Sequence, residues 1–175
     1  MSGGAARRPL WPPFVALTAG VVVVDQVTKA WLVSTLSPGE STPIVGDLLR
    51  LVYSQNNGGL FGLFRGQAVP FALLSLGVMG LIAAYHARSG RSPYLTLTLG
   101  LLLGGALGNA IDRVRLGYVV DFVDAGIGSV RWYTFNVADS AISLAILLLI
   151  AASLRPTITS WSPRGTPAPT AEDHA

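Results

Sequence analysis

The chain has 175 residues, of which 51% are hydrophobic and 12% are charged, and its twelve basic and nine acidic residues give a net charge of +3. A single soluble core of this length cannot bury so much apolar surface, so the composition excludes an ordinary soluble globular protein and indicates a membrane protein. The basic residues form no run and Cys is absent, so neither nucleic acid nor a Cys-ligated metal is expected, and membrane lipids are the expected surroundings.

The first apolar segment covers residues 14–36, which at about 1.5 Å per residue is enough to cross a bilayer. Arg7 and Arg8 precede it, as basic residues precede a secretory signal. The segment lacks a small-residue cleavage site and contains Asp25, so we interpret it as an uncleaved transmembrane anchor. Residues 1–13 are then expected to form a cytoplasmic N-terminal segment.

A connection with strand patterning follows this segment. Apolar residues alternate with polar ones toward Leu49 and Tyr53, which is typical of a short strand. The dipeptide Asn57-Gly58 is typical of a tight turn. The sequence therefore predicts a small β region over residues 41–64.

Three further apolar segments are long enough to span a membrane. The predicted helices cover residues 68–87, 94–112 and 137–155. Residues 118–123 fit either a strand or a helix end, and the tail 156–175, rich in Pro, Ser and Thr, is predicted to be a disordered cytoplasmic segment. The predicted fold is an all-α membrane protein in which residues 14–155 form four transmembrane helices with a small extracytoplasmic β-sheet or loop region.

An even number of spans places both chain ends on the same side of the membrane. The twelve basic residues divide equally between the two sides, so the positive-inside rule does not set the orientation. The acidic residues are unequal, because the terminal side carries only those of the tail. We therefore expect both termini in the cytoplasm and the other acidic residues near the extracytoplasmic face of the bacterial inner membrane.

Polar side chains gather near the predicted extracytoplasmic ends of the apolar segments. They are Asp25, Asn109, Asp112, Asp121, Asn136 and Asp139. Ionisable groups inside spans are costly, so such a cluster indicates a functional site. Two carboxyl groups held close together share a proton, and the ionised one can activate water for peptide hydrolysis. His86, directly after the apolar run of residues 68–85, is expected at the loop end of the second helix, and His174 in the tail. Their positions argue against a His-based metal site or a Ser-His triad.

Five sequence blocks carry a family resemblance. They are Asp25-Gln26-Val27-Thr28-Lys29, Asn56-Asn57-Gly58, residues 104–113, Val120-Asp121-Phe122 and Phe135-Asn136-Val137-Ala138-Asp139. In their order and spacing they resemble the signature of the signal peptidase II family. The resemblance implies an aspartic endopeptidase that cuts diacylglyceryl-modified bacterial prolipoproteins on the amino side of the lipidated Cys. It also implies inhibition by the cyclic peptide globomycin and the use of no metal or cofactor, and we expect a monomer.

The resemblance implies roles for individual residues. Asp121 and Asp139 would form the catalytic dyad. The supporting and substrate-binding residues would be Asp25, Lys29, Asn56, Gly58, Asn109, Asp112, Arg113, Asn136 and Ala138. The sequence departs from the family pattern in two places: Gly59-Leu60-Phe61 replaces Ala-Ala-Phe, and Trp132-Tyr133-Thr134 stands where a Pro commonly precedes the last block.

Several of these residues also fit a purely structural interpretation. Asp25 and Lys29, four positions apart on a helix, fit an ion pair. Asn136 fits the cap of the fourth helix, with an acidic residue favoured in the first turn. Asp112 fits a local pair with Arg113 and is also a rival candidate for the catalytic acid.

Other features leave alternatives open as well. Gly104, Gly105 and Gly108 fit close helix packing better than a place in the site. The main alternative function is a small proton or cation transporter, because intramembrane acids also bind ions. A Ser-Lys protease would have to use the only lysine, which has no specially placed serine near it. The acids lie near one interface only, which favours the hydrolase over the transporter.

Overall fold

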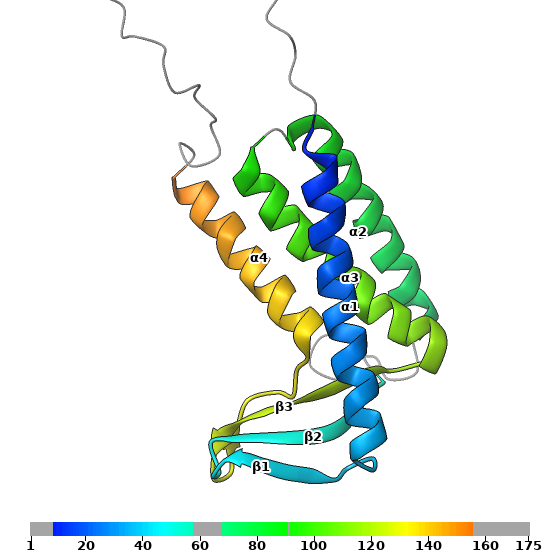
Figure 1. The fold of residues 1–175 in the computed structure, drawn as a ribbon, viewed down its shortest axis with the longest axis vertical. Coiled ribbons are helices and arrows are strands. Elements are labelled where there is room, and N and C mark those ends of the chain that lie inside the picture. Colours follow the sequence, from blue (N-terminus) through cyan, green and yellow to red (C-terminus); the bar gives the residue numbers. More distant parts are fainter. Residues whose placement is uncertain (1–8, 58–67, 91, 156–175) are drawn as a thin grey trace, which may run out of the picture.

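The computed structural model describes residues 9–57, 68–90 and 92–155, and for residues 68–72 it describes the backbone only. The described helices and strands form one helical bundle with an antiparallel sheet across one of its ends (Figure 1). The helices are α1 (Trp11–Thr35), α2 (Ala68–Ser89), α3 (Pro93–Leu116) and α4 (Val137–Leu154). The strands are β1 (Ser41–Val45), β2 (Leu49–Asn56), β3 (Val119–Ile127) and β4 (Val130–Arg131). Residues 58–64 of the predicted β region, which include Gly58, and the predicted tail 156–175 lie outside the described residues.

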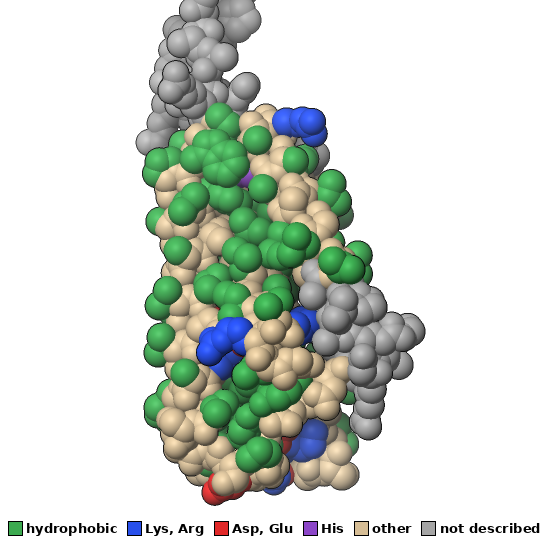
Figure 2. All heavy atoms as spheres, turned by 90° about the vertical axis from the view of Figure 1, so that its right-hand side faces the viewer, with side chains coloured by type: hydrophobic (Ala, Val, Ile, Leu, Met, Phe, Trp, Pro, Cys, Tyr) green, Lys and Arg blue, Asp and Glu red, His purple; other side chains and the backbone are tan. Residues whose placement is uncertain are grey.

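Helices occur at all four predicted positions, and α1, α3 and α4 are each long and apolar enough to cross a membrane. The third helix is a turn longer than predicted and continues to Leu116. It ends there because Gly117 adopts a left-handed conformation, with φ of 80°, and its N–H donates to the Arg113 carbonyl at 3.1 Å. Figure 2 shows hydrophobic side chains along the helices, with the acidic side chains on this face gathered at the sheet end.

The sheet has the strand order β1-β2-β3-β4, and its central pair joins distant parts of the chain. Residues 118–123, which fitted a strand or a helix end, belong to β3 apart from Tyr118. Strand β3 pairs antiparallel with β2, so that Ser54 lies opposite Asp121 and Asn56 opposite Val119. This register brings the predicted catalytic acid of β3 beside the end of β2.

The C-terminal end of α1 packs against the sheet. Leu32 and Leu36 are buried against Tyr53 of β2 and against Val120 and Phe122 of β3. Burial of a large apolar side chain stabilises the fold by about 1.5–3 kcal/mol. This cluster therefore fixes the position of β3 against the C-terminal end of α1.

Glycines of α3 allow the helices to approach closely. A Cβ at Gly104 would lie 2.7 Å from Val21 Cβ of α1, and one at Gly105 would lie 2.4 Å from the Ala138 carbonyl oxygen of α4. Any larger residue would push these helices apart, so the packing interpretation of these two glycines is confirmed.

The prediction that His86 lies at the loop end of the second helix is wrong. Helix α2 continues to Ser89, and the His86 side chain is fully buried at the end of the bundle opposite the sheet. Its ring stacks on Phe14 at a centroid distance of 4.0 Å, and its Nε2 lies 3.4 Å from Thr96 Oγ1. The Phe14 ring of α1 and the Thr96 hydroxyl of α3 contact the imidazole inside the bundle. The apolar sequence of α2 alone does not indicate these contacts.

Candidate active site

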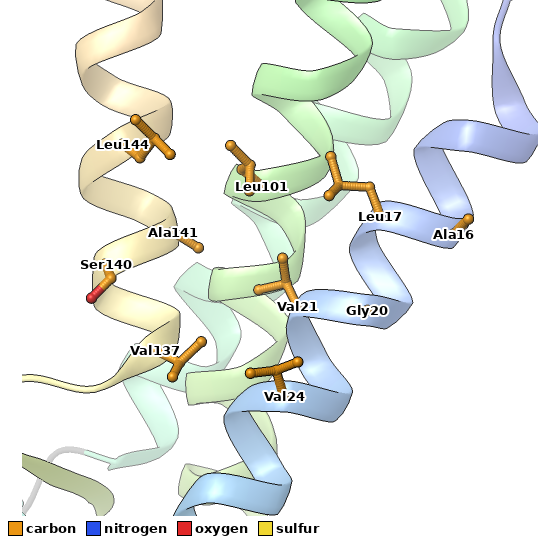
Figure 3. Close-up of a pocket in the computed structure, with 10 residues that line it drawn as sticks. All are labelled: Ala16, Leu17, Gly20, Val21, Val24, Leu101, Val137, Ser140, Ala141 and Leu144. Atoms are coloured by element: carbon orange, nitrogen blue, oxygen red, sulfur yellow. The ribbon is translucent and has the colours of Figure 1, made fainter.

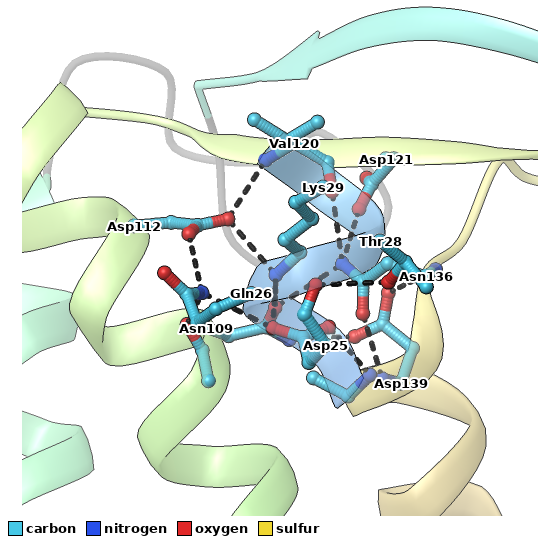
Figure 4. A network of polar contacts seen from close by, with 12 residues as sticks. Asp25, Gln26, Thr28, Lys29, Asn109, Asp112, Val120, Asp121, Asn136 and Asp139 are labelled. Carbon is cyan, nitrogen blue, oxygen red and sulfur yellow. Dashed lines mark hydrogen bonds and ion pairs between the residues drawn. The ribbon is translucent and has the colours of Figure 1, made fainter. Parts of the chain in front are cut away.

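The Lys29 ammonium is the centre of a buried polar network (Figure 4). Its Nζ lies 2.8 Å from Asp25 Oδ2, 2.9 Å from Asp112 Oδ2 and 3.0 Å from Asn109 Oδ1. Three acceptors match the three N–H donors of an ammonium group, so the cation is fully satisfied although the residue is only 3% exposed. The predicted Asp25–Lys29 ion pair is confirmed, and the same ammonium ties α1 to α3.

Asp25 links α1 to the beginning of α4. Its Oδ1 accepts a hydrogen bond of 2.9 Å from the Ala138 backbone N–H, one of the N–H groups that a helix leaves without an intrahelical partner. A Cβ at Gly108 would lie 2.6 Å from Asp25 Oδ2. Gly108 therefore makes room for a carboxylate of the network as well as for helix packing.

Asp112 connects α3 to β3. Its Oδ2 accepts from the Val120 backbone N–H at 3.1 Å, and its Oδ1 accepts from Gln26 Nε2 at 2.9 Å. The Val120 bond fixes the strand one residue before Asp121. Sequence reasoning did not single out Gln26, although a polar amide inside an apolar span next to Asp25 was the available signal.

Asn136 and Asp139 form a capping box at the start of α4. The Asp139 N–H donates to Asn136 Oδ1 at 2.9 Å, and Asp139 Oδ2 accepts from the Asn136 N–H at 3.3 Å. The predicted cap is therefore confirmed. This pairing also holds the Asp139 carboxylate near the positive end of the helix dipole.

A chain of side-chain amides joins the two predicted catalytic acids. Asn136 Nδ2 donates to Asp121 Oδ1 at 2.7 Å and to Asn109 Oδ1 at 3.1 Å. Asn109 Nδ2 in turn donates to Asp139 Oδ1 at 2.7 Å. On the other side, Asn56 Nδ2 donates to Asp121 Oδ2 at 3.0 Å. Each carboxyl group is thus oriented by an amide at each of its oxygens or by an amide and a backbone N–H.

The charges around the two acids do not balance. Asp121 is 1% exposed, and this burial, followed by the negative charge of Asp139, raises the pKa of Asp121 to about 7. The site holds four acids, including Asp25 and Asp112, against the two cations Lys29 and Arg113. If one of the two acids keeps its proton, the excess of negative charge becomes smaller. The pair then contains one protonated and one ionised carboxyl group, as acid–base catalysis by two carboxylates requires.

The structure brings together almost all the residues singled out in the sequence. Arg113 adjoins the network through its Nη1, which donates to the Asn109 carbonyl at 3.4 Å, and Gly58 lies outside the described residues. Within the described part of the chain, no group of three His, Asp or Glu side chains is arranged to hold a metal ion.

An apolar groove of about 450 Å³ runs between α1 and α4, next to the start of α4 (Figure 3). It is lined by Ala16, Leu17, Gly20, Val21, Val24, Leu101, Val137, Ser140, Ala141 and Leu144. The lining offers a hydroxyl group at Ser140 but no charged side chain, so the groove suits an apolar chain rather than the chemical step.

A known family model covers most of the chain. Residues 17–155 match the family model described as signal peptidase (SPase) II. The chain belongs to the signal peptidase II family. This membership, with the three apolar helices, makes it a membrane protease.

Curated relatives named lipoprotein signal peptidase cover most of the chain. The relative from Moorella thermoacetica is 41% identical over 145 residues, which are 82% of this chain and 94% of that protein. The one from Trichormus variabilis is 46% identical over 136 residues, 75% of this chain and 83% of that protein. The one from Halothermothrix orenii is 39% identical over 130 residues, 74% and 87% of the two chains.

Two solved structures of bacterial membrane enzymes have the same fold. One, determined at 2.3 Å resolution, gives a TM-score of 0.81 at 28% identity and covers 93% of this chain and 100% of its own. The other, determined at 1.9 Å resolution, gives a TM-score of 0.78 at 29% identity, covering 87% and 99%.

Proposed function

We propose that this signal peptidase II is an aspartic endopeptidase that removes signal peptides from diacylglyceryl-modified bacterial prolipoproteins, cutting on the amino side of the lipidated Cys. The names of the curated relatives support a lipoprotein precursor as substrate. The observation that carries the aspartic mechanism is the pair of Asp121 and Asp139, whose carboxyl groups are linked through the amides of Asn136 and Asn109.

Hydrolysis by this pair requires one acid to be ionised and the other protonated. The ionised carboxylate removes a proton from water, which attacks the scissile carbonyl, and the protonated carboxyl donates to the carbonyl oxygen. The charge excess in the site and the raised pKa of Asp121, about 7, support such a half-protonated pair at neutral pH. Water and two carboxyl groups suffice for this reaction, so we propose no metal or cofactor.

The remaining residues of the proposed site orient the pair. Asn56 and Asn136 hold Asp121, and Asn109 holds Asp139. Lys29 and Asp25 fix the helices from which these side chains project. Arg113 and the segment that begins at Gly58 are proposed to contact the substrate.

The proposed topology has four transmembrane helices, with α2 as the fourth, and both termini in the cytoplasm. All acids of the described helices lie in their sheet-side halves, which supports a site near the extracytoplasmic face. One chain supplies every residue of the pair and its hydrogen-bond partners, which supports a monomer surrounded by lipid. Occupation of the same site by globomycin would block cleavage.

Purified protein in lipid nanodiscs, given a diacylglyceryl-modified precursor, tests this function. We expect cleavage of the modified precursor and none of the same precursor without the lipid. Asp121→Asn and Asp139→Asn should each lower the rate about a thousand-fold or more, because a pair cannot act with one member. The matched control is Asp124→Asn, since Asp124 lies in the same strand but bonds Arg131 away from the pair. Full activity of Asp121→Asn, with activity abolished in Asp112→Asn, would assign the acid role to Asp112 instead.

Ion transport is the competing function, and the helices argue against it. A transporter needs a relay of ionisable groups across the membrane. Within the described helices, no Asp or Glu occupies the half opposite the sheet. Proton flux into liposomes that contain the protein, without precursor cleavage, would contradict the peptidase proposal.

A further inference from the structure

The two acids of the pair have unequal surroundings. Asp121 is 1% exposed, and among the described residues it accepts from the neutral side-chain amides of Asn136 and Asn56. Asp139 is only half-buried and lies in the first turn of α4, where the helix dipole favours a negative charge. Its carboxylate accepts from a backbone N–H as well as from the amide of Asn109. Burial opposes a charge on Asp121 more strongly than on Asp139.

A hydrogen-bonded chain also connects Asp139 to the buried cation. Lys29 Nζ donates to Asn109 Oδ1 at 3.0 Å, and Asn109 Nδ2 donates to Asp139 Oδ1 at 2.7 Å. A cation on the carbonyl oxygen of an amide polarises its NH2 group, so the bond from Asn109 to an ionised carboxylate is strengthened. The route from Lys29 to Asp121 is one amide longer, because it passes through both Asn109 and Asn136.

Of the other charged groups near the pair, Arg113 favours an ionised Asp139 and Asp25 opposes one. Helix α1 contributes Asp25 and Lys29, and α3 contributes Asp112 and Arg113. Asp25 is bound to the Ala138 N–H and Asp112 to the Val120 N–H, so each of these carboxylates is neutralised in part by a backbone donor and by Lys29.

We propose that Asp121 carries the proton of the resting pair, that Asp139 is the ionised base, and that Lys29 is a positioning residue which maintains this order through Asn109. The proton location is a property of the resting protein, and only its use in catalysis rests on the proposed function.

The assignment gives a balanced reaction. Asp139 accepts a proton from water as the water oxygen bonds to the carbonyl carbon, and the carbonyl oxygen takes the proton of Asp121. The tetrahedral intermediate then returns a hydroxyl proton to Asp121 as its C=O bond re-forms. The C–N bond breaks while the leaving nitrogen takes the proton held by Asp139, so both acids end in their starting states.

Infrared spectroscopy locates the proton without any cleavage assay. At about pH 5, exposed Asp side chains are largely ionised while a buried acid with a raised pKa keeps its proton. We expect a protonated-carboxyl C=O band in the wild-type protein, its loss in Asp121→Asn, and its retention in Asp139→Asn and in the control Asp124→Asn. A band lost in Asp139→Asn and kept in Asp121→Asn would overturn the assignment.

The role of Lys29 is tested by the pH dependence of cleavage. Lys29 pairs with the carboxylates of Asp25 and Asp112. The double variant Lys29→Met/Asp112→Asn removes the cation together with one of these two acids, so that only Asp25 loses its charged partner. We expect the acidic limb of its rate profile to move upward by about one pH unit. Lys29→Arg, which keeps the charge, should retain the wild-type limb.

The matched control is Gln26→Met, because Gln26 bonds the same acids without a charge. It should lower thermal stability and leave the limb in place. If the acidic limb of the pH–rate profile is unchanged in the double variant, or moves equally in Gln26→Met, Lys29 has only a structural role and the proposal for Lys29 is wrong. Absence of cleavage in every variant, with the infrared result as expected, would contradict the proposed function and leave the proton assignment standing.

Discussion

Gly108→Ala tests whether the space beside Asp25 is as tight as the structure shows. The added Cβ would lie 2.6 Å from Asp25 Oδ2, whereas ordinary contacts begin at 3.4 Å, so the carboxylate would have to move by 3.4 − 2.6 = 0.8 Å. Asp25 cannot move that far and keep its bonds of 2.8 Å to Lys29 and 2.9 Å to the Ala138 N–H.

The free-energy change can be worked from these contacts. Loss of a hydrogen bond to a charged group costs about 1.5–3 kcal/mol, and overpacking costs about 1–3 kcal/mol. Replacing Gly by Ala in a helix returns about 1 kcal/mol. We therefore expect Gly108→Ala to lose about 1.5–5 kcal/mol of unfolding free energy.

Thermal unfolding in detergent measures this loss, and each kcal/mol corresponds to about 2–4 °C in Tm for a chain of this size. Gly20→Ala in α1 is the matched control, because a Cβ there meets nothing within 4 Å. It should leave Tm unchanged or raise it slightly. If Gly108→Ala were as stable as Gly20→Ala, the close contact between α3 and the Asp25 carboxylate would be refuted.

Two further predictions concern the pH dependence of stability and the opposite end of the bundle. Burial and the charge of Asp139 raise the pKa of Asp121 from 3.8 to about 7, so the stability from its bound proton is complete below 3.8 and is lost as pH rises toward 7. The unfolding free energy of Asp121→Asn, measured by chemical denaturation, should therefore depend less on pH between 3.8 and about 7. At about pH 8 it should equal or exceed the unfolding free energy of the wild type. An unchanged pH slope would contradict the raised pKa. Gly90→Ala should lower Tm, because its Cβ would lie 2.4 Å from the His86 ring, whereas Gly80→Ala, with nothing within 4 Å, should not; equal Tm values would show that the ring can move aside.

Local patterns were enough to predict the elements and the contacts within them. Runs of apolar residues located all four helices, and alternation located β2. A spacing of four residues predicted the Asp25–Lys29 pair, and the order of residues at the start of α4 predicted the Asn136 cap. Each of these depends on neighbours within one turn or one strand, which the sequence states directly.

Contacts between elements could not be derived in the same way. No local pattern indicates that Gln26 bonds Asp112, that Asp25 accepts from the Ala138 N–H, or that His86 is enclosed by α1 and α3. These contacts depend on how each helix is rotated about its axis and on how far it slides along its neighbour.

The sequence by itself determined the four helices, the membrane as surroundings, the collection of polar residues at one depth and the family. Only the tertiary structure decided how Asp121 and Asp139 are connected. The register between β2 and β3, and the docking of α3 between α1 and α4, set which amide meets which carboxyl group. Hydrogen bonds require their atoms within about 3 Å, and that distance between residues far apart in the chain is fixed by packing rather than by sequence spacing.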